Sequence, residues 1–500
     1  MSLARSAARG AALLSVTNLT AYAVSFGATL ALARMVAPNE FGKVVFAIAV
    51  AELLFVLGAW SLPVALIREP QETLDEAFDT AMALLVPISG ALVVASAGVA
   101  AGLWALEGAA IALVLLAIVG GRVLQLFAGC FIACLERDFA YGRFSLIQLA
   151  SVGSGAAVAL ALAHRGAGVW ALGARDVAVS VVMVALAVAF TRHAPGRRFS
   201  AAKARELLRF GAGMVGSRLG EMLFHRYDNL VVGVVSGARQ LGLYNQGYVL
   251  TETGNRLYGP VLQQLPLATY ARIQDDRERT ARVFALLMFI LSRGVTPLAL
   301  LFLVLPGETL AFLYGEPWRE GAPMLRLLSV YALLAPLFDQ MRVLLVANGQ
   351  VGSVLRARLW QLGLFLPAVP LCSWLWGGVG AAAAVAVGMT AGVVAIVPHV
   401  RRLAPLSWRE FIAPVVAAAA SAVAAFAVLS AGVEGDLPRL ALGGLTLAAM
   451  YAMALALVDG ARMLAHGRTI LAGLRSAPGH EDRPELRAGA LGAARATSRG

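Results

Sequence analysis

The stretch from Leu207 to Val235 reads LLRFGAGMVGSRLGEMLFHRYDNLVVGVV. It is long enough to cross a bilayer as one helix, since about 20 residues suffice. Its charged or titratable side chains include Arg218, Glu221, His225 and Asp228. These follow one another at steps of three, four and three residues, so they share one face of a helix. Because a charge that faces hydrocarbon is strongly unfavourable, this face is expected to look into protein or a water-filled cavity, as in a transporter.

The composition places the whole chain in a membrane. Of its 500 residues 59% are hydrophobic and 14% are charged, with a mean hydropathy of +0.77, whereas soluble domains are about 25% charged. The net charge of +12 would suit nucleic acid, but the arginines cluster in short connections between apolar segments, as in membrane proteins that obey the positive-inside rule. We therefore expect a polytopic membrane protein with no nucleic-acid partner.

The sequence carries no signal for a cofactor or for covalent chemistry. It contains no P-loop of the form G-x-x-x-x-G-K-[ST], so an internal ATPase is not expected. The cysteines, Cys130, Cys134 and Cys372, all fall within apolar segments, which is typical of packing residues rather than of a disulfide framework or a metal site. We expect no cofactor, no metal and no enzyme activity.

Apolar segments recur along the chain and predict an all-α protein with about fourteen membrane helices. The predicted bounds are Ala11–Ala33, Phe41–Ile67, Phe78–Leu103, Ala109–Leu135, Phe144–Ala163, Val169–Phe190, Leu207–Val235, Leu241–Leu267, Thr280–Val304, Gly321–Val346, Leu359–Trp376, Gly380–Val397, Phe411–Leu429 and Leu440–Val458. Alternate connections are rich in arginine, as between residues 192 and 205, and the positive-inside rule places this set in the cytoplasm. Both termini are then cytoplasmic.

The chain contains a weak internal repeat. Val36–Gly42 (VAPNEFG) resembles Ser236–Gly242 (SGARQLG) at an offset of 200 residues, and at that offset Glu52 falls on Glu252. Such a repeat predicts two six-helix lobes related by an axis along the membrane normal, with a site between them. The predicted parts are an N-terminal lobe (1–190), a cytoplasmic linker (191–206), a C-terminal lobe (207–400), an added helix pair (401–460) and a basic, disordered cytoplasmic tail (461–500).

Several short motifs resemble the polysaccharide (O-antigen, Wzx-type) flippases of the multidrug/oligosaccharidyl-lipid/polysaccharide exporter superfamily. The resemblance extends from about Arg34 to Arg358 and depends on the order and spacing of the motifs. The motifs are ARMVAPNEFG at Ala33–Gly42, LRFG at Leu208–Gly211, RYDN at Arg226–Asn229, LGLY at Leu241–Tyr244, ARIQDD at Ala271–Asp276 and PMLRLL at Pro323–Leu328.

The resemblance implies a flippase of the bacterial plasma (inner) membrane. Its substrate would be an oligosaccharide on a polyprenyl pyrophosphate, moved from the inner to the outer leaflet for polysaccharide export. Two lobes would alternate around a central cavity, among membrane lipids and with the polysaccharide polymerase and export machinery as partners.

Other functions remain open from the sequence. A peptidoglycan-precursor (lipid II) flippase would differ in substrate alone, and a multidrug or cation antiporter of the same superfamily would favour a carboxylate-lined cavity. A membrane glycosyl-polymerase or ligase is disfavoured, because the longest predicted outer loop, roughly Leu305–Gly321, is too short for a catalytic domain.

Arginines in the middle of predicted membrane helices are the best candidates for binding an anionic head, because the guanidinium can grip phosphate at two points. They are Arg122, Arg218 and Arg293. The alternative is that each pairs with a buried carboxylate for structural reasons.

Carboxylates and a histidine within the predicted spans are candidates for ion coupling, since loading them with protons or sodium changes which conformation is stable. They are Asp228, Glu221, His225, Glu52 and Glu252. The alternative is a static network of ion pairs. Arg175 and Asp176 are interpreted as a local pair, as are Asp339 and Arg342.

Overall fold

The structure is a computed structural model. It describes residues 3–58, 62–191, 193, 195–273, 276–404, 408–430 and 435–475. Within these ranges the backbone alone is described at residues 3–9, 11, 12, 57, 58, 106, 107, 217, 221, 224, 255–269, 271–273, 408–412, 428, 430 and 461–475. The tail predicted over 461–500 is helical as far as Arg475, where the last helix ends, and its residues 476–500 lie outside the described ranges.

The regular elements in the described ranges are helices, so the predicted all-α fold is confirmed there. In chain order they are α1 (Leu3–Met35), α2 (Pro38–Gly58), α3 (Leu62–Arg68), η1 (Gln71–Thr73), α4 (Leu74–Glu107), α5 (Ala109–Arg137), α6 (Tyr141–His164), α7 (Val169–Phe190), α8 (Ala201–His225), α9 (Tyr227–Ile273), α10 (Arg277–Val304), α11 (Pro306–Tyr314), η2 (Glu316–Gly321), α12 (Ala322–Ala347), α13 (Val351–Arg401), α14 (Trp408–Ser430) and α15 (Asp436–Arg475).

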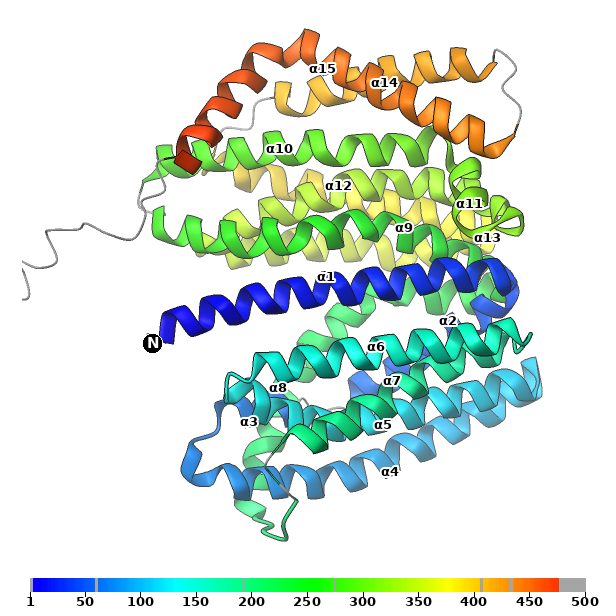
Figure 1. Cartoon of the computed structure of the whole chain (residues 1–500), viewed down its shortest axis with the longest axis vertical. Helices are drawn as coiled ribbons and strands as arrows, with labels where there is room; N and C mark the ends of the chain where they lie inside the picture. The colour runs from blue at the N-terminus through cyan, green and yellow to red at the C-terminus, as the bar shows by residue number, and fades with distance from the viewer. Residues whose placement is uncertain are drawn as a thin grey trace, which may run out of the picture.

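The helices form two bundles that lie side by side (Figure 1). The N-terminal bundle holds α1 to α7, and the C-terminal bundle holds α9, α10, α12 and α13, with the α14–α15 pair packed on the outside of α10. Small residues let helices approach closely within a bundle, as at Gly155 of α6, where an added Cβ would lie 2.4 Å from Val179 of α7. The lobe boundaries predicted from the sequence remain predictions.

The prediction of one continuous helix over Leu207–Val235 is wrong. Helix α8 ends at His225, Arg226 has φ −137° and ψ −11°, and α9 begins at Tyr227. The first turn of α9 is held by Asp228, whose carboxylate accepts the N–H of Asn229 at 2.8 Å and the hydroxyl of Tyr244 at 2.5 Å. The stripe from Arg218 to Asp228 therefore does not share one helical face.

Helix α9 holds the end of the predicted span Leu207–Val235 and all of Leu241–Leu267, and α13 holds both Leu359–Trp376 and Gly380–Val397. Helix α9 is interrupted at Gly237, with φ 82°, and α13 at Trp376 and Gly377, with φ −132° and 60°. Positive φ is accessible to glycine at little cost, so Gly237 and Gly377 are the points where the chain turns between spans. In contrast, α7 (Val169–Phe190) has the bounds that the sequence predicts.

The two bundles touch through α2 and α9 at residues of the internal repeat. A Cβ on Gly42 would lie 1.6 Å from the carbonyl oxygen of Ala238, and a Cβ on Gly242 would lie 2.0 Å from that of Pro38. These contacts are reciprocal at the offset of 200 residues that the repeat has in the sequence. A two-fold relation between the halves produces this pattern, and only glycine allows such an approach.

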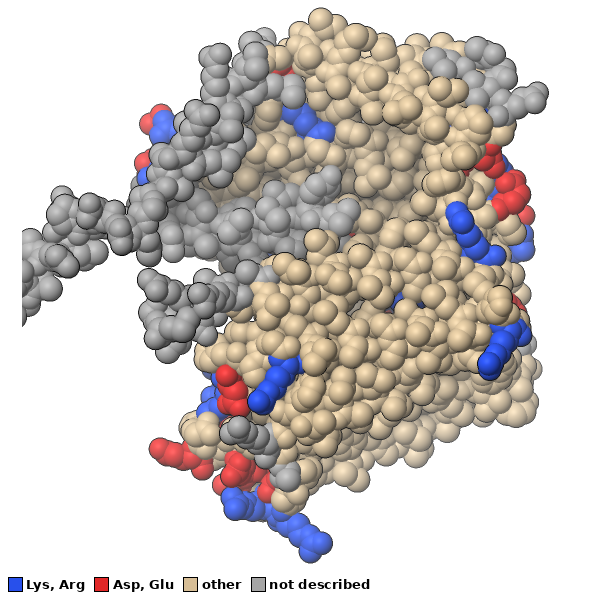
Figure 2. All heavy atoms as spheres, viewed as in Figure 1, with Lys and Arg blue, Asp and Glu red and all other residues tan. Residues whose placement is uncertain are grey.

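Within the described residues, nine helices are long and apolar enough to cross a membrane: α1, α4, α5, α6, α7, α10, α12, α13 and α15. Their outward faces carry large apolar side chains, such as Val94, Trp374 and Leu457, which are 73%, 76% and 82% exposed. On the face drawn in Figure 2, most Lys, Arg, Asp and Glu side chains lie toward the left and right edges, with a wide band of other residues between them. The chain is a multi-pass membrane protein.

Candidate functional site

A cavity of about 630 Å³ lies between the two bundles. Its walls come from α1, α2, α6 and α7 on one side and from α9 and the α8–α9 junction on the other. The polar and titratable residues along it are Tyr22, Ser25, Thr29, Arg175, Asp176, His225, Arg226, Asn245, Gln246, Tyr248 and Glu252. Since a polar cavity within membrane helices is unfavourable unless it holds water or a polar ligand, this is the candidate site.

Arg175 is a cation of the N-terminal bundle at this cavity. Its guanidinium donates to the Ser25 hydroxyl at 2.5 Å and to the Thr29 hydroxyl at 3.1 Å, both on α1. Ser25 and Thr29 are four residues apart and so lie on one face of α1. Because both acceptors are neutral, they fix the position of the guanidinium without cancelling its charge.

A chain of ion pairs crosses from one bundle to the other beside the cavity. Arg226 Nε lies 2.7 Å from Glu52 Oε2 in an ion pair, and Arg226 also donates to the other carboxylate oxygen at 3.4 Å. On the far side of Glu52, Arg122 lies 3.7 Å away, and Arg122 in turn lies 3.6 Å from Asp176. Glu52, Arg122 and Asp176 belong to α2, α5 and α7, whereas Arg226 belongs to the α8–α9 junction.

Tyrosines connect the carboxylates of the C-terminal bundle. Asp228 is 3% exposed and accepts from Tyr244, as described above. Tyr331 donates to Glu252 and lies 3.2 Å, hydroxyl to hydroxyl, from Tyr248. Asp228 is buried and Glu252 is half-buried, and both carboxylates are held by hydrogen bonds within their own bundle.

The predicted site residues are distributed unevenly. His225 and Glu252 line the cavity, Arg122 and Glu52 lie beside it in the ion-pair chain, and Asp228 is buried behind it. Their roles in binding or ion coupling remain predictions.

Two predicted ligands lie elsewhere. Arg218 is exposed on α8 and is not among the residues that line the cavity. Arg293 is 8% exposed on α10, forms an ion pair with Asp459 of α15, and stacks over the Phe289 ring at 3.6 Å from its centroid. This contact is the structural pairing that stood as the alternative to a binding role.

Sequence reasoning missed Arg175 and Arg226 as cavity residues. Arg175 was interpreted as the partner of its neighbour Asp176, yet its hydrogen bonds reach 146 and 150 residues back along the chain. Arg226 falls within the stretch predicted as one helix, and it enters the cavity because the helix breaks there. Its place in the RYDN motif was the signal that could have found it.

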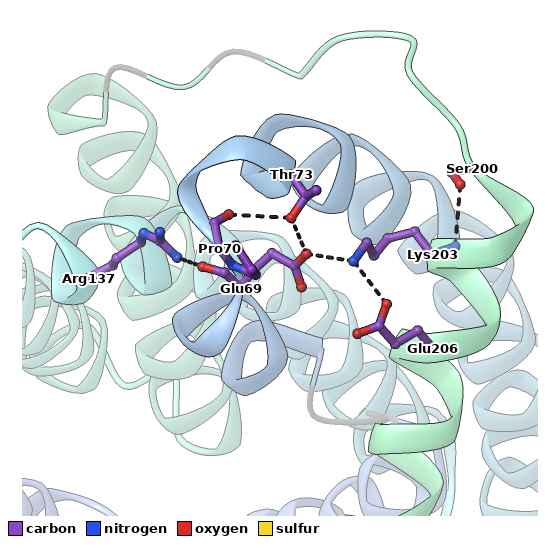
Figure 3. A network of polar contacts seen from close by, with 7 residues as sticks. All are labelled: Glu69, Pro70, Thr73, Arg137, Ser200, Lys203 and Glu206. Atoms are coloured by element: carbon purple, nitrogen blue, oxygen red, sulfur yellow. Dashed lines mark hydrogen bonds and ion pairs between the residues drawn. The ribbon is translucent and has the colours of Figure 1, made fainter.

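A separate polar cluster ties the start of α8 to the N-terminal bundle (Figure 3). Lys203 Nζ lies 2.6 Å from Glu69 Oε1 and 2.9 Å from Glu206 Oε2, and Thr73 donates to Glu69 at 2.5 Å. Burial opposes ionisation of Glu69, but the hydrogen bonds from Lys203 and Thr73 outweigh it and lower the pKa of that carboxyl. The hydrogen bonds to Glu69 and Glu206 raise the pKa of Lys203.

Two bundles of membrane helices around a polar cavity define a transporter fold. A family model described as "Polysaccharide biosynthesis protein" matches residues 31–323, so the chain belongs to that family. The resemblance found in the motifs is thereby confirmed.

Curated relatives support the same assignment. The chain is 26% identical over 302 residues to the succinoglycan biosynthesis transport protein ExoT of Rhizobium meliloti (strain 1021), covering 60% of each protein. It is 25% identical over 256 residues to the lipopolysaccharide biosynthesis protein WzxC of Escherichia coli (strain K12), covering 50% of this chain and 51% of the relative. The match thus spans only about 60% and about half of these relatives' lengths.

Solved structures share the fold at low identity. Lipid II flippase MurJ in an inward closed conformation superposes with a TM-score of 0.70 at 11% identity, covering 90% of this chain and 99% of MurJ. An inward-facing multidrug resistance MATE family transporter gives a TM-score of 0.58 at 15% identity, covering 78% and 98%. The predicted exporter-superfamily fold is confirmed.

Proposed function

We propose that this protein moves an oligosaccharide linked to a polyprenyl pyrophosphate across the bacterial inner membrane, for polysaccharide export. The observation that carries the proposal is the polar cavity between the bundles, to which each bundle contributes an arginine, Arg175 and Arg226. The family and the names of ExoT and WzxC support a polysaccharide precursor as cargo. Both termini face the cytoplasm in this proposal.

The chemistry of the cavity suits a pyrophosphate with adjoining sugars. Arginine binds phosphate oxygens in two places, and Asn245 and Gln246 offer amide groups of the kind that bond sugar hydroxyls. The volume of about 630 Å³ is within the range of small-ligand pockets, about 300–1,000 Å³. A longer oligosaccharide would require the bundles to separate, which alternating access supplies.

The transport cycle requires no covalent chemistry, so the proposal is a transporter and not an enzyme. His225, Glu52, Glu252 and Asp228 are the groups through which a proton or sodium gradient would act. A drug or cation antiporter is the second candidate, favoured by the half-buried carboxylates Asp176 and Glu252 at the cavity.

The test uses cells that lack the protein and any redundant flippase, with leaflet-resolved detection of lipid-linked oligosaccharide. We expect the intermediate to build up on the cytoplasmic leaflet, the wild type to clear it, and Arg175→Gln, although expressed, to fail. Arg165→Gln, at an exposed position between α6 and α7, is the matched control and should clear it. Normal arrival on the outer leaflet without the protein would overturn the proposal, and accumulation of lipid II instead would identify the peptidoglycan precursor as cargo.

A further inference from the structure

We infer that the Glu52 carboxylate occupies, in the substrate-free protein, the position of the substrate's anionic head. An incoming phosphate replaces Glu52 at Arg226 and thereby releases the ion pair that joins the two bundles. This inference rests on the proposed function for the identity of the anion, but the exchange itself is a property of the residues described above.

The Arg226–Glu52 pair has the geometry of a bound ligand. The 2.7 Å and 3.4 Å approaches place both carboxylate oxygens against one guanidinium, as the oxygens of a phosphate would lie. The side chains are 37% and 23% exposed, so the pair borders the cavity and is not sealed in the protein. A phosphate that enters the cavity therefore reaches Arg226 directly.

A second cation, Arg122, lies near Glu52. Arg122 lies 3.7 Å away, too far for a hydrogen bond, and its buried Nε has no hydrogen-bond partner among the described residues. Asp176, the other neighbour of Arg122, likewise has a buried Oδ2 without a hydrogen bond in that part of the chain. Arg122 is thus loosely held and has donors to offer to Glu52.

The exchange keeps every charge paired. When phosphate binds Arg226, Glu52 moves toward Arg122 and pairs with it. The movement is small, because it only shortens the present Arg122–Glu52 separation to the length of a hydrogen bond. Neither carboxylate nor guanidinium is left unpaired among membrane helices, where an uncompensated buried charge would be strongly destabilising. If Glu52 left Arg226 without an incoming anion, the Arg226 guanidinium would have no partner.

The consequence is a coupling between loading and movement. Arg226 belongs to the C-terminal half and Glu52 to α2, the helix that also carries the Gly42 contact with α9. A ligand shifts a conformational equilibrium only through its different affinity for the two states. Phosphate has a different affinity for the two states, because it can bind Arg226 fully only in the state in which the Arg226–Glu52 pair is broken.

The experiment measures binding of inorganic pyrophosphate to the purified full-length protein by titration calorimetry. Glu52→Gln removes the competing carboxylate at nearly constant volume, and we expect it to raise the affinity about tenfold, a coupling of the size found between contacting groups. In an Arg226→Gln background the same substitution should bring no gain. Glu252→Gln removes a cavity carboxylate that Tyr331 holds, and its smaller electrostatic gain should persist without Arg226.

A second readout follows the bundles. Spin labels go on cysteines at Arg165 and at Leu437, exposed positions of α6–α7 and α15, in a chain whose native cysteines are alanine. We expect pyrophosphate to change this distance in the wild type, and Glu52→Gln to show the change without pyrophosphate. If Glu52→Gln does not fold, Glu52→Asp, which draws the charge back by one methylene, should change both readouts in the same direction.

An affinity for pyrophosphate that is unchanged or weaker in Glu52→Gln, no binding by either protein, or a gain that survives in Arg226→Gln would each overturn the inference. Its failure is distinct from failure of the proposed function. If the coupling is measured but the protein moves no lipid-linked oligosaccharide, the flippase proposal fails and the ion-pair exchange stands. If the protein moves that lipid and the coupling is absent, the reverse holds.

Discussion

Arg175 owes its place in the cavity to two hydroxyl groups rather than to a carboxylate. Ser25 and Thr29 hold its guanidinium from α1 and leave its charge available. This differs from Arg226, which is already neutralised by Glu52. The two cavity arginines therefore have different states before substrate arrives: Arg175 is the first point of attraction, and Arg226 binds only after exchange.

The geometry of Arg175 predicts that lysine will not replace it. Arg175→Lys keeps the charge but loses the planar fork that reaches Ser25, Thr29 and a phosphate together. Since a hydrogen bond to a charged group contributes about 1.5–3 kcal/mol, we expect clearance of the lipid-linked oligosaccharide to slow at least about tenfold. The leaflet assay measures it, with Arg165→Lys as the control. Wild-type clearance by Arg175→Lys would show that charge alone suffices.

The Glu69–Lys203 pair predicts a pH-dependent contribution to stability. Glu69 has a lowered pKa in the folded protein, so its contribution is present above its unfolded pKa and is lost as the pH falls through its folded pKa. Lys203 has a raised pKa, so its contribution is present below its unfolded pKa and is lost only as the pH rises through its folded pKa.

Lys203→Met should therefore lower the thermal unfolding temperature at neutral pH. The difference from the wild type should shrink as the pH falls below about 4, where a carboxyl group takes up its proton. Unfolding in detergent, followed by intrinsic fluorescence across a pH series, measures it. A difference that stays constant down to the lowest pH at which both proteins fold would contradict the prediction.

Among the elements, α2 and α9 carry the contact between the bundles. Gly42→Ala would place a methyl group 1.6 Å from the Ala238 carbonyl oxygen. Overpacking of this kind destabilises a contact by about 1–3 kcal/mol, so the bundles should part at this point without ligand. The spin-label distance between positions 165 and 437 should lengthen, whereas Gly98→Ala, with nothing near its added Cβ, should leave it unchanged. An unchanged distance in Gly42→Ala would show that the bundles pivot elsewhere.

The α14–α15 pair is fastened to α10 by Arg293 and Asp459, both buried. Asp459→Leu leaves the arginine unpaired and should destabilise the protein by about 3–5 kcal/mol, whereas Arg293→Met with Asp459→Leu should restore most of that loss. Thermal unfolding of the three proteins measures it. The double variant also tests the binding role predicted for Arg293: if it is stable but no longer clears lipid-linked oligosaccharide, Arg293 contacts substrate.

Helix positions followed from the sequence wherever hydrophobicity alone decides them. Helix α7 is an example, because a run from Val169 to Phe190 has no alternative to crossing as a helix. The Leu207–Val235 stretch failed because its break depends on distant partners: Arg226 reaches Glu52, 174 residues away, and Asp228 reaches Tyr244. The candidate site was predicted in part: His225 and Glu252 line the cavity, whereas Arg175 was missed because its position depends on hydroxyl groups of α1.

At the scale of the whole molecule, the internal repeat and the inter-bundle ion pair lie at the same boundary between the halves. The repeat brings Gly42 and Gly242 together where the halves meet, and Glu52 pairs with Arg226 across the same boundary. Arg175, Asp228 and Glu252 are each held by hydrogen bonds within their own bundle, so the bundles can move as units once the Arg226–Glu52 pair opens. This is what alternating access around a central cavity requires.

The most direct measurement of the central claim is flipping by the purified protein in liposomes. The liposomes contain a polyprenyl-pyrophosphate-linked oligosaccharide, and a sugar-cleaving enzyme added outside reports how fast the inner pool becomes accessible. We predict that the wild type exposes the inner pool and that Arg175→Gln does so at least about tenfold more slowly, from the loss of a charged hydrogen bond. Exposure by the wild type no faster than in protein-free liposomes, under an imposed proton or sodium gradient as well as without one, would contradict the claim that this protein is a flippase.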